Sequence, residues 1–362
     1  MQGDFISYPR GRARFANAVA TAGGRLDSIA NPNATTAEGH PITMDIAWIG
    51  PVEPTGLLLS TSGVHGLEAP AGSAALCHFL QNLPPLPSGI AIALIHGVNG
   101  WGWAHNSRAN EHNVDLNRNM ADFSHAPEKN TLYKDALHDI FCPAAISDDP
   151  TAQMRTALES IAARHGPDAV KIALDQGQYE RPDGVYYGGA RTEWSNAILL
   201  SEINKRIAGV RHVAYIDWHT GIGEFGETFF ICHNTDDIEA HRRAATWWEG
   251  GHIPSWDDKP PSRRGLIIKA VEAATKAAGA RFTGATVEFG VRPPDAVEAA
   301  IMVDRALRFG VVAPETPHYK KAKEFMIDAF CPDSDVWRRQ ILERALPVFD
   351  AALTGLKDET DR

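Results

Sequence analysis

The stretch Ser62-Gly63-Val64-His65-Gly66-Leu67-Glu68 decides how the rest of the chain is interpreted. It follows an apolar run at residues 57–59 that predicts a short buried strand, and it precedes residues 69–83, which the pattern predicts to be a helix. A histidine and a glutamate three residues apart on a glycine-flanked turn can direct an imidazole nitrogen and a carboxylate oxygen at one ion. Catalytic zinc sites use three such protein groups and leave a fourth position open. The stretch therefore predicts part of a metal site whose third ligand comes from elsewhere.

A strand, a helix and a second strand surround this turn. Residues 42–49 alternate well enough to predict a strand, and residues 90–95 form another apolar run after a proline-rich loop at residues 84–87. Two apolar strands joined through a helix predict a parallel crossover connection. We therefore expect an α/β fold with helices on both faces of its sheet. In such a sheet, ligands bind at the loops that leave the carboxyl ends of the strands.

Downstream segments place further polar residues at strand ends. Residues 213–216 predict a strand that runs directly into Asp217 and His219, and residues 285–290 predict a strand that carries Glu288 near its end. The remaining pattern predicts a strand over residues 228–232, a turn at Asn31-Pro32-Asn33, and helices over residues 8–22, 128–140, 152–163, 196–207, 238–248, 266–278, 295–309, 319–330 and 336–356. We expect residues 1–362 to form a single domain, with a helical insertion at about residues 121–195.

A long polar segment, residues 96–119, follows the second apolar strand. It shows little periodicity and contains Arg108, Asn117 and Arg118. Because the carboxyl ends of parallel strands meet at one edge of a sheet, this segment and the turn at His65 should be neighbours. A guanidinium binds a carboxylate bidentately and can stabilise a developing oxyanion. The segment is therefore predicted to be a substrate-binding loop.

His65, Glu68 and His219 together form a candidate His/Glu/His zinc site. Bound zinc lowers the pKa of its water toward 7 and polarises a carbonyl, which points to hydrolysis. Glu288 could take the proton from that water as a general base, or it could be a structural carboxylate paired with Arg292.

Other residues near the predicted site also have a structural interpretation. Arg108 and Arg118 could form ordinary surface salt bridges, which contribute little to stability. Asp217 could orient His219 or cap a turn. Three further histidines are expected to be neighbours of the ligands or surface groups, because the three ligand positions are already filled: His96, His105 and His112.

The motifs in this order resemble those of the zinc metallocarboxypeptidases and their aspartoacylase and succinylglutamate desuccinylase relatives. The match consists of His65-x-x-Glu68, then Arg108, Asn117-Arg118, His219 and Glu288. The resemblance is closest to a bacterial branch of this clan without assigned function. In that branch a Gly-x-His-Gly-x-Glu turn precedes a Val-Asp-Leu-Asn-Arg-Asn motif, and Asp-x-His and Glu-Phe-Gly follow. The similarity extends from about residue 15 to residue 309.

The resemblance implies a three-layer α/β/α sandwich around a mixed, mostly parallel sheet, with one zinc ion per chain. In this reading His65, Glu68 and His219 hold the zinc and Glu288 activates its water. Arg108 stabilises the oxyanion and contacts substrate, and Asn117 with Arg118 binds a terminal carboxylate. The expected activity is cleavage of an amide bond next to a free carboxylate, by a metallocarboxypeptidase that acts on small peptides.

Two departures from the peptidase pattern support an alternative. Leu67 stands where peptidases of the clan usually have an arginine, and Gly66 follows the histidine as it does in the deacylase relatives. An N-acyl amino acid deacylase is therefore the first alternative, and an inactive module that binds peptide termini is the second.

Carboxypeptidases also cover the substrate with a mobile tyrosine, for which Tyr186, Tyr187 and Tyr319 are candidates.

Composition excludes some classes of partner. The formal net charge of -10 and the pI near 5.8 argue against a nucleic-acid or acidic-membrane partner. The four cysteines form no CxxC pair, and residues 1–15 carry three arginines without a following apolar segment. We expect a cytoplasmic protein without a membrane span, and the sequence makes no prediction about its oligomeric state.

Overall fold

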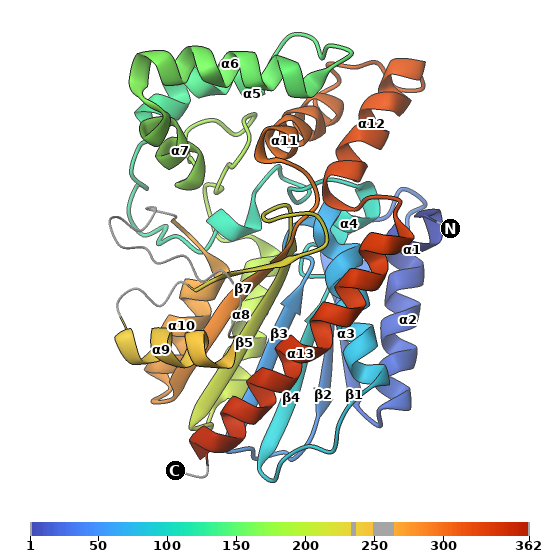
Figure 1. The fold of residues 1–362 in the computed structure, drawn as a ribbon, viewed down its shortest axis with the longest axis vertical. Coiled ribbons are helices and arrows are strands. Elements are labelled where there is room, and N and C mark those ends of the chain that lie inside the picture. The colour runs from blue at the N-terminus through green and yellow to red at the C-terminus, as the bar shows by residue number, and fades with distance from the viewer. Residues whose placement is uncertain (1, 233–236, 249–263, 361–362) are drawn as a thin grey trace.

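A seven-stranded sheet runs through the computed structural model, which describes residues 2–232, 237–248 and 264–360 (Figure 1). Its strands, in the order in which they lie in the sheet, are β1 (Arg25–Thr35), β2 (Pro41–Ile49), β4 (Ile90–His96), β3 (Gly56–Ser62), β5 (His212–Thr220), β7 (Arg281–Phe289) and β6 (Thr228–Ile231). The pairs β4–β3, β3–β5 and β5–β7 are parallel, whereas β2 and β6 run antiparallel to their neighbours. The predicted α/β fold with a mixed, mostly parallel sheet is confirmed.

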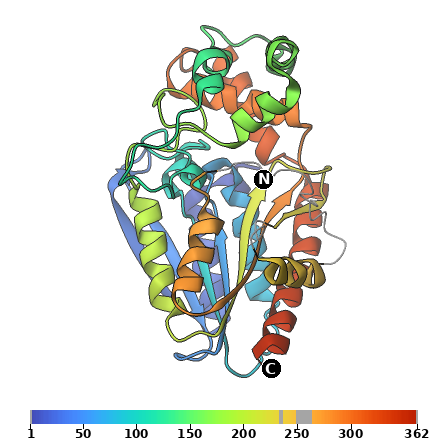
Figure 2. The same ribbon diagram turned by 90° about the vertical axis from the view of Figure 1, so that its left-hand side faces the viewer.

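Helices cover both faces of this sheet, so that the structure has the three layers expected (Figure 2). One face carries α2 (Tyr8–Thr21), α3 (Ala69–Gln81) and α13 (Asp335–Thr360), and the opposite face carries α8 (Trp194–Ile207) and α10 (Ile267–Ala277). Each face has its own apolar core, in which helix side chains pack against the strands. The shorter helices of this part are α1 (Gln2–Ile6), α4 (Gly100–His105) and α9 (Ile238–Trp247).

A further group of helices lies over the carboxyl ends of the strands (Figure 1). The predicted insertion supplies a π-helical turn (Tyr133–Leu137), α5 (His138–Phe141), α6 (Pro150–His165) and α7 (Pro167–Asp175). The C-terminal part of the chain supplies α11 (Pro294–Arg308) and α12 (Pro317–Phe330). Apolar side chains from both parts share one core cluster. The helices of residues 121–195 are thus packed at the edge of the sheet where ligands bind in α/β folds.

The β3–α3–β4 unit is the crossover that the sequence predicted. β3 lies between β4 and β5 and is buried along its whole length. α3 begins with small residues, and a Cβ atom on Gly72 would lie 2.7 Å from Cβ of Ser62. Glycine at this position therefore allows the helix to pack directly against the end of β3.

Some local predictions differ from the structure. The turn predicted at Asn31-Pro32-Asn33 is wrong, because these residues lie within β1, where the pairing with β2 shifts register between Ala30 and Thr35. β1 is an edge strand, so a proline there removes no hydrogen bond from the centre of the sheet. The strand predicted over residues 213–216 is longer in the structure, because β5 continues to Thr220, and His219 lies near its carboxyl end as predicted.

None of the helices in the described part of the chain combines the length and apolar character that crossing a membrane requires.

Candidate metal centre

Two neighbouring strands bring His65, Glu68 and His219 together. His65 and Glu68 belong to the connection from β3 to α3, in which a 3-10 turn, η1, spans Gly66–Glu68. His219 lies near the end of β5, the parallel neighbour of β3. One potential ligand atom of each residue lies within 4.8 Å of the other two, and all three side chains are buried. The convergence of parallel strand ends therefore assembles the three residues that the sequence singled out.

Both histidines present Nδ1 to the same carboxylate. His65 Nδ1 lies 2.9 Å from Glu68 Oε1, and His219 Nδ1 lies 3.0 Å from Glu68 Oε2. The opposite ring nitrogens contact carboxylates, since His65 Nε2 lies 3.0 Å from Asp115 and His219 Nε2 lies 2.9 Å from Asp217. A carboxylate at Nε2 favours the tautomer whose Nδ1 lone pair is free to bind a metal. Asp217 therefore orients His219 and does not cap a turn.

The buried atoms at this point fit a metal ion. His65 Nδ1 makes no hydrogen bond despite its closeness to Glu68, and Glu288 Oε2 has no hydrogen-bond partner among the described residues. Buried polar atoms without partners are uncommon in folded proteins. Two imidazoles and one carboxylate form a donor set typical of catalytic zinc. The residues present therefore fit zinc.

Glu288 lies beside these three residues on β7. It pairs with His219 in the register of β5 and β7, and its side chain is buried. Burial raises the pKa of Glu288 to about 7, although the neighbouring His219 opposes this shift. Arg292, its alternative partner, instead binds Asp328 with an Nε to Oδ2 distance of 2.9 Å. A buried carboxylate with a pKa near neutrality suits a general base.

Charge is balanced around the candidate ligands. Burial alone would raise the pKa of Glu68, but the rings of His65 and His219 hold it well below its usual range. Burial likewise opposes ionisation of Asp115, and His65 with Arg108 holds the pKa of that carboxyl well below its usual range. The site therefore presents ionised carboxylates in a buried setting, an arrangement that favours a cation.

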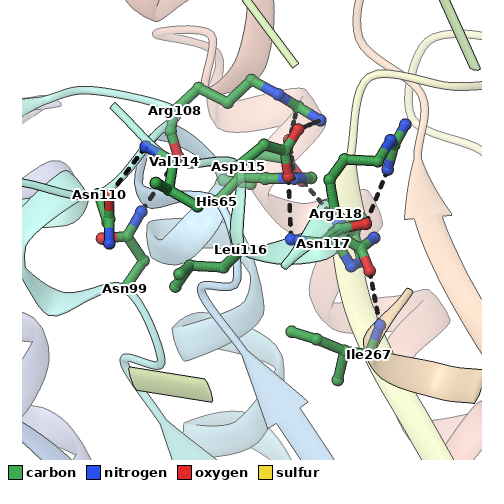
Figure 3. Close-up of polar contacts among 12 residues, drawn as sticks. His65, Asn99, Arg108, Asn110, Val114, Asp115, Leu116, Asn117, Arg118 and Ile267 are labelled. Atoms are coloured by element: carbon green, nitrogen blue, oxygen red, sulfur yellow. Dashed lines mark hydrogen bonds and ion pairs between the residues drawn. The ribbon is translucent and has the colours of Figure 1, made fainter. Parts of the chain in front are cut away.

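Arg108 connects the candidate ligands to the polar loop (Figure 3). Its Nη1 donates to Glu68 Oε1 at 2.9 Å and its Nη2 donates to Asp115 Oδ2 at 3.3 Å. Asp304 on α11 accepts a hydrogen bond from the backbone N–H of Arg108 at 2.7 Å and so holds the loop that carries Arg108 against α11. Arg108 is therefore an inward-facing member of the site and not a surface salt bridge.

Asn117 and Arg118 lie on a 3-10 turn, η2 (Leu116–Arg118), next to Arg108 (Figure 3). Asp115 Oδ1 accepts the backbone N–H of Asn117 at 2.9 Å, so one aspartate holds both this turn and His65. The side-chain oxygen of Asn117 accepts the backbone N–H of Ile267 at 3.0 Å, which leaves the amide nitrogen as the end that can bind another group. The Arg118 side chain is buried, and its Nη1 donates to the carbonyl of Asn117 at 2.9 Å.

Asp115 and Asp304 are the members of the site to which sequence reasoning gave no role. Asp115 stands two residues before Asn117 in a motif that the sequence displays, but its partner His65 is 50 residues away. Asp304 lies in α11 and contacts the loop 196 residues earlier. Only the fold could reveal these two contacts.

The three remaining histidines of the region have partners outside the candidate ligand set. They bind Ser73 Oγ at 2.9 Å (His96), the carbonyl of Thr35 at 2.9 Å (His105) and Glu193 at 2.6 Å (His112).

A second group of potential ligands occurs at His138, Cys142 and Asp183. Here the carboxylate of Asp183 lies 3.6 Å from Arg181 and 3.7 Å from Arg305. Burial also raises the pKa of the Cys142 thiol to about 11. Two guanidiniums and a protonated thiol disfavour a cation, so ion pairing explains this group.

Comparison with known protein families shows to which of them this chain belongs. A family model described as "Protein of unknown function (DUF2817)" matches residues 5–344. The chain belongs to this family. The prediction of a family without an assigned function is thereby confirmed. No curated protein sequence matches this DUF2817 chain.

Two of the solved structures that resemble this DUF2817 protein have the following similarity to it. Bovine thrombin-activatable fibrinolysis inhibitor, in complex with tick carboxypeptidase inhibitor, is 12% identical with a TM-score of 0.47, over 98% of this chain and 97% of that one. A metallo-carboxypeptidase from Pseudomonas aeruginosa is 14% identical with a TM-score of 0.41, over 92% of this chain and 69% of that one.

Proposed function

We propose that this protein is a zinc-dependent hydrolase that cleaves an amide bond next to a free carboxylate, as a metallocarboxypeptidase acting on small peptides. The convergence of His65, Glu68 and His219, with Glu288 beside them on the next strand, is the observation that carries the proposal. The donor set and the orphaned Nδ1 of His65 support zinc as the metal. When bound at such a site, zinc polarises the scissile carbonyl and lowers the pKa of a water molecule.

In this proposal each residue of the chain has a separate task. Glu288 takes a proton from the attacking water and passes it to the leaving amine, a role that its raised pKa supports. Arg108 donates an N–H toward the oxyanion that develops on the carbonyl. Each terminal nitrogen of its guanidinium has a second N–H beyond those that bind Glu68 and Asp115. Arg118 and the amide nitrogen of Asn117 bind the free carboxylate of the substrate.

An N-acyl amino acid deacylase would use the same metal, base and carboxylate site. Packing alone requires a glycine at position 66, because an added Cβ atom would lie 2.0 Å from the carbonyl carbon of Gly102. Gly66 therefore does not distinguish a deacylase from a carboxypeptidase. The products of the reaction distinguish the two activities.

The test is mass spectrometry of the products after the zinc-loaded protein meets a mixed pool of peptides and N-acyl amino acids. The Glu288→Gln variant serves as the blank, and we expect it to keep its zinc while turnover falls about a hundredfold or more. Loss of single residues from peptide carboxyl ends supports the carboxypeptidase. Release of free acids from acyl amino acids, with intact peptides, replaces it with the deacylase. Failure to take up zinc would leave only the inactive binding module.

A further inference from the structure

Tyr186 lies against both arginines of the site. Its ring centroid is 5.8 Å from Cζ of Arg108 and 5.9 Å from Cζ of Arg118. Guanidiniums within about 6 Å of an aromatic ring gain a cation–π attraction that increases when the contact is shielded from water. The Tyr186 side chain is buried, so both contacts are shielded. One ring therefore contacts the two positive groups for which the proposed function requires fixed positions.

The structure holds this ring from both ends. The phenol donates to Glu298 Oε2 at 2.5 Å, and Glu298 lies on α11. On the backbone side, the carbonyl of Tyr186 accepts the N–H of Gln178 at 3.0 Å, and the carbonyl of Tyr187 accepts the N–H of Asp115 at 2.8 Å. The loop that carries the ring is thus bonded to the segment that carries Arg118.

The backbone of Tyr186 is strained. Its φ of +54° lies in the left-handed region, which is unfavourable for a tyrosine. Such a conformation persists only where the surroundings determine it, and it occurs preferentially at functional sites. With this backbone conformation, the side chain contacts both arginines and Glu298.

We infer that Tyr186, anchored by Glu298, is a positioning residue that fixes the guanidinium of Arg118 for the carboxylate of the ligand and that of Arg108 for the oxyanion. Arginine side chains lose considerable rotamer entropy when they are ordered, and a ring that orders them before the ligand arrives removes that cost from binding. The inference rests on the proposed function in that Arg118 binds a carboxylate and Arg108 stabilises the oxyanion. Tyr186 is then a fixed residue and not a mobile lid, because its phenol binds Glu298 and its backbone carbonyl binds Gln178.

The other two candidate tyrosines lack these contacts. Tyr187 contributes its backbone carbonyl to Asp115, and Tyr319 lies on α12, in a cavity with Trp101 and Arg308. Tyr319→Phe is therefore a matched control, which removes one phenol oxygen from a tyrosine without the ring contacts to Arg108 and Arg118.

The experiment measures the binding of two small probes to the zinc-loaded protein by calorimetry. The first probe, 3-phenylpropionate, carries a carboxylate for Arg118, and the second, acetohydroxamate, binds a metal ion and has no carboxylate. Tyr186→Leu, which removes the ring, is expected to weaken 3-phenylpropionate about tenfold and to leave acetohydroxamate within about twofold of the original. Tyr186→Phe keeps the ring and loses the bond to Glu298, so we expect an intermediate loss of about threefold. Tyr319→Phe should bind both probes as the unaltered protein does.

The outcomes separate this inference from the proposed function. An equal loss of both probes in Tyr186→Phe would indicate a general structural effect and would overturn the positioning role. The positioning role would also be overturned if Tyr186→Leu bound 3-phenylpropionate as tightly as the unaltered protein does, or if 3-phenylpropionate did not bind the unaltered protein at all. If the unaltered protein binds 3-phenylpropionate, Tyr186→Leu loses that binding alone and no substrate is hydrolysed, the positioning role stands and the proposed hydrolase does not. Where hydrolysis is observed, Tyr186→Leu should raise KM through Arg118 and lower kcat through Arg108.

Discussion

Burial makes the charged form of Glu288 unfavourable, so the free energy of unfolding depends on pH. Its pKa rises from 4.5 to about 7 because the side chain is buried. Between these two values the folded protein binds more protons than the unfolded chain does. The free energy of unfolding therefore falls as the pH rises through this window, and the loss is complete above about pH 7. A residue suited to act as a base thus lowers the stability of the metal-free protein.

Replacing Glu288 by glutamine should therefore stabilise the metal-free protein in a pH-dependent way. We expect Glu288→Gln to unfold in urea with a free energy higher by up to about 3 kcal/mol near pH 8, and with little difference near pH 4.5. Glu343→Gln, at an exposed position, is the control and should change neither value. Equal stability of Glu288→Gln and the unaltered protein at both pH values would contradict the burial effect.

Asp217 is expected to act on the metal through His219. Its Oδ2 contacts His219 Nε2 at 2.9 Å, and its Oδ1 accepts a hydrogen bond from Thr61 at 2.6 Å. Asp217→Asn keeps the size of the side chain but favours less strongly the His219 tautomer whose Nδ1 is free to bind a metal, so zinc affinity should fall about 10- to 100-fold. Competition with a chelator of known affinity measures this, with the exposed Asp122→Asn as the control. Unaltered affinity in Asp217→Asn would show that the tautomer is fixed by other contacts.

At the scale of the elements, the turn between β3 and α3 is held by the close approach of α4. A Cβ atom on Gly66 would lie 2.0 Å from the carbonyl carbon of Gly102 and 2.3 Å from the backbone nitrogen of Trp103. These are backbone atoms of a helix, which cannot move without displacing the helix. The spacing of His65 and Glu68 thus depends on a glycine between them.

Gly66→Ala should destabilise the protein and weaken zinc binding together. Overpacking of this kind costs about 1–3 kcal/mol of unfolding free energy, and the displaced turn separates the two candidate ligands. Gly3→Ala is the matched control, since a Cβ atom on Gly3 would meet nothing within 4 Å. Denaturant unfolding and zinc titration measure the two effects, and a loss of stability with full zinc affinity would show that the turn adapts.

The elements also show which parts of the structure a sequence can predict. Apolar runs such as residues 57–59 and 90–95 indicate buried strands, and the convergence of parallel strand ends then places His219 near His65. β1 was not recognised because Asn31-Pro32-Asn33 has the composition of a turn, which an edge strand can nevertheless tolerate. Glu298 and Asp304 were not recognised because carboxylates on an amphipathic helix ordinarily face solvent. Their partners come from loops more than 100 residues away in the sequence.

At the scale of the whole molecule, the candidate metal centre lies where the sandwich meets the helices over its edge. Thr220, next to His219, donates its hydroxyl to the carbonyl of Phe330 at the end of α12 at 2.8 Å. Asp304 of α11 binds the backbone of Arg108, and Glu298 of the same helix binds Tyr186. Contacts from both parts of the chain thus meet within the site. A ligand bound there is expected to stabilise the two parts as one unit.

Zinc should therefore raise the thermal stability of the entire chain in a single transition. A ligand that binds only the folded state at a hundredfold excess over its Kd adds about 2.7 kcal/mol, which corresponds to an increase in Tm of about 3–4 °C for a chain of this length. Removal of the metal with a chelator should reverse the shift, and His219→Ala should abolish it, because that variant lacks one of the three candidate ligands. Calorimetric scans with and without zinc measure the effect. If zinc shifted only part of a divided transition, the sandwich and the overlying helices would unfold separately, and the contacts of Thr220, Asp304 and Glu298 would not couple them.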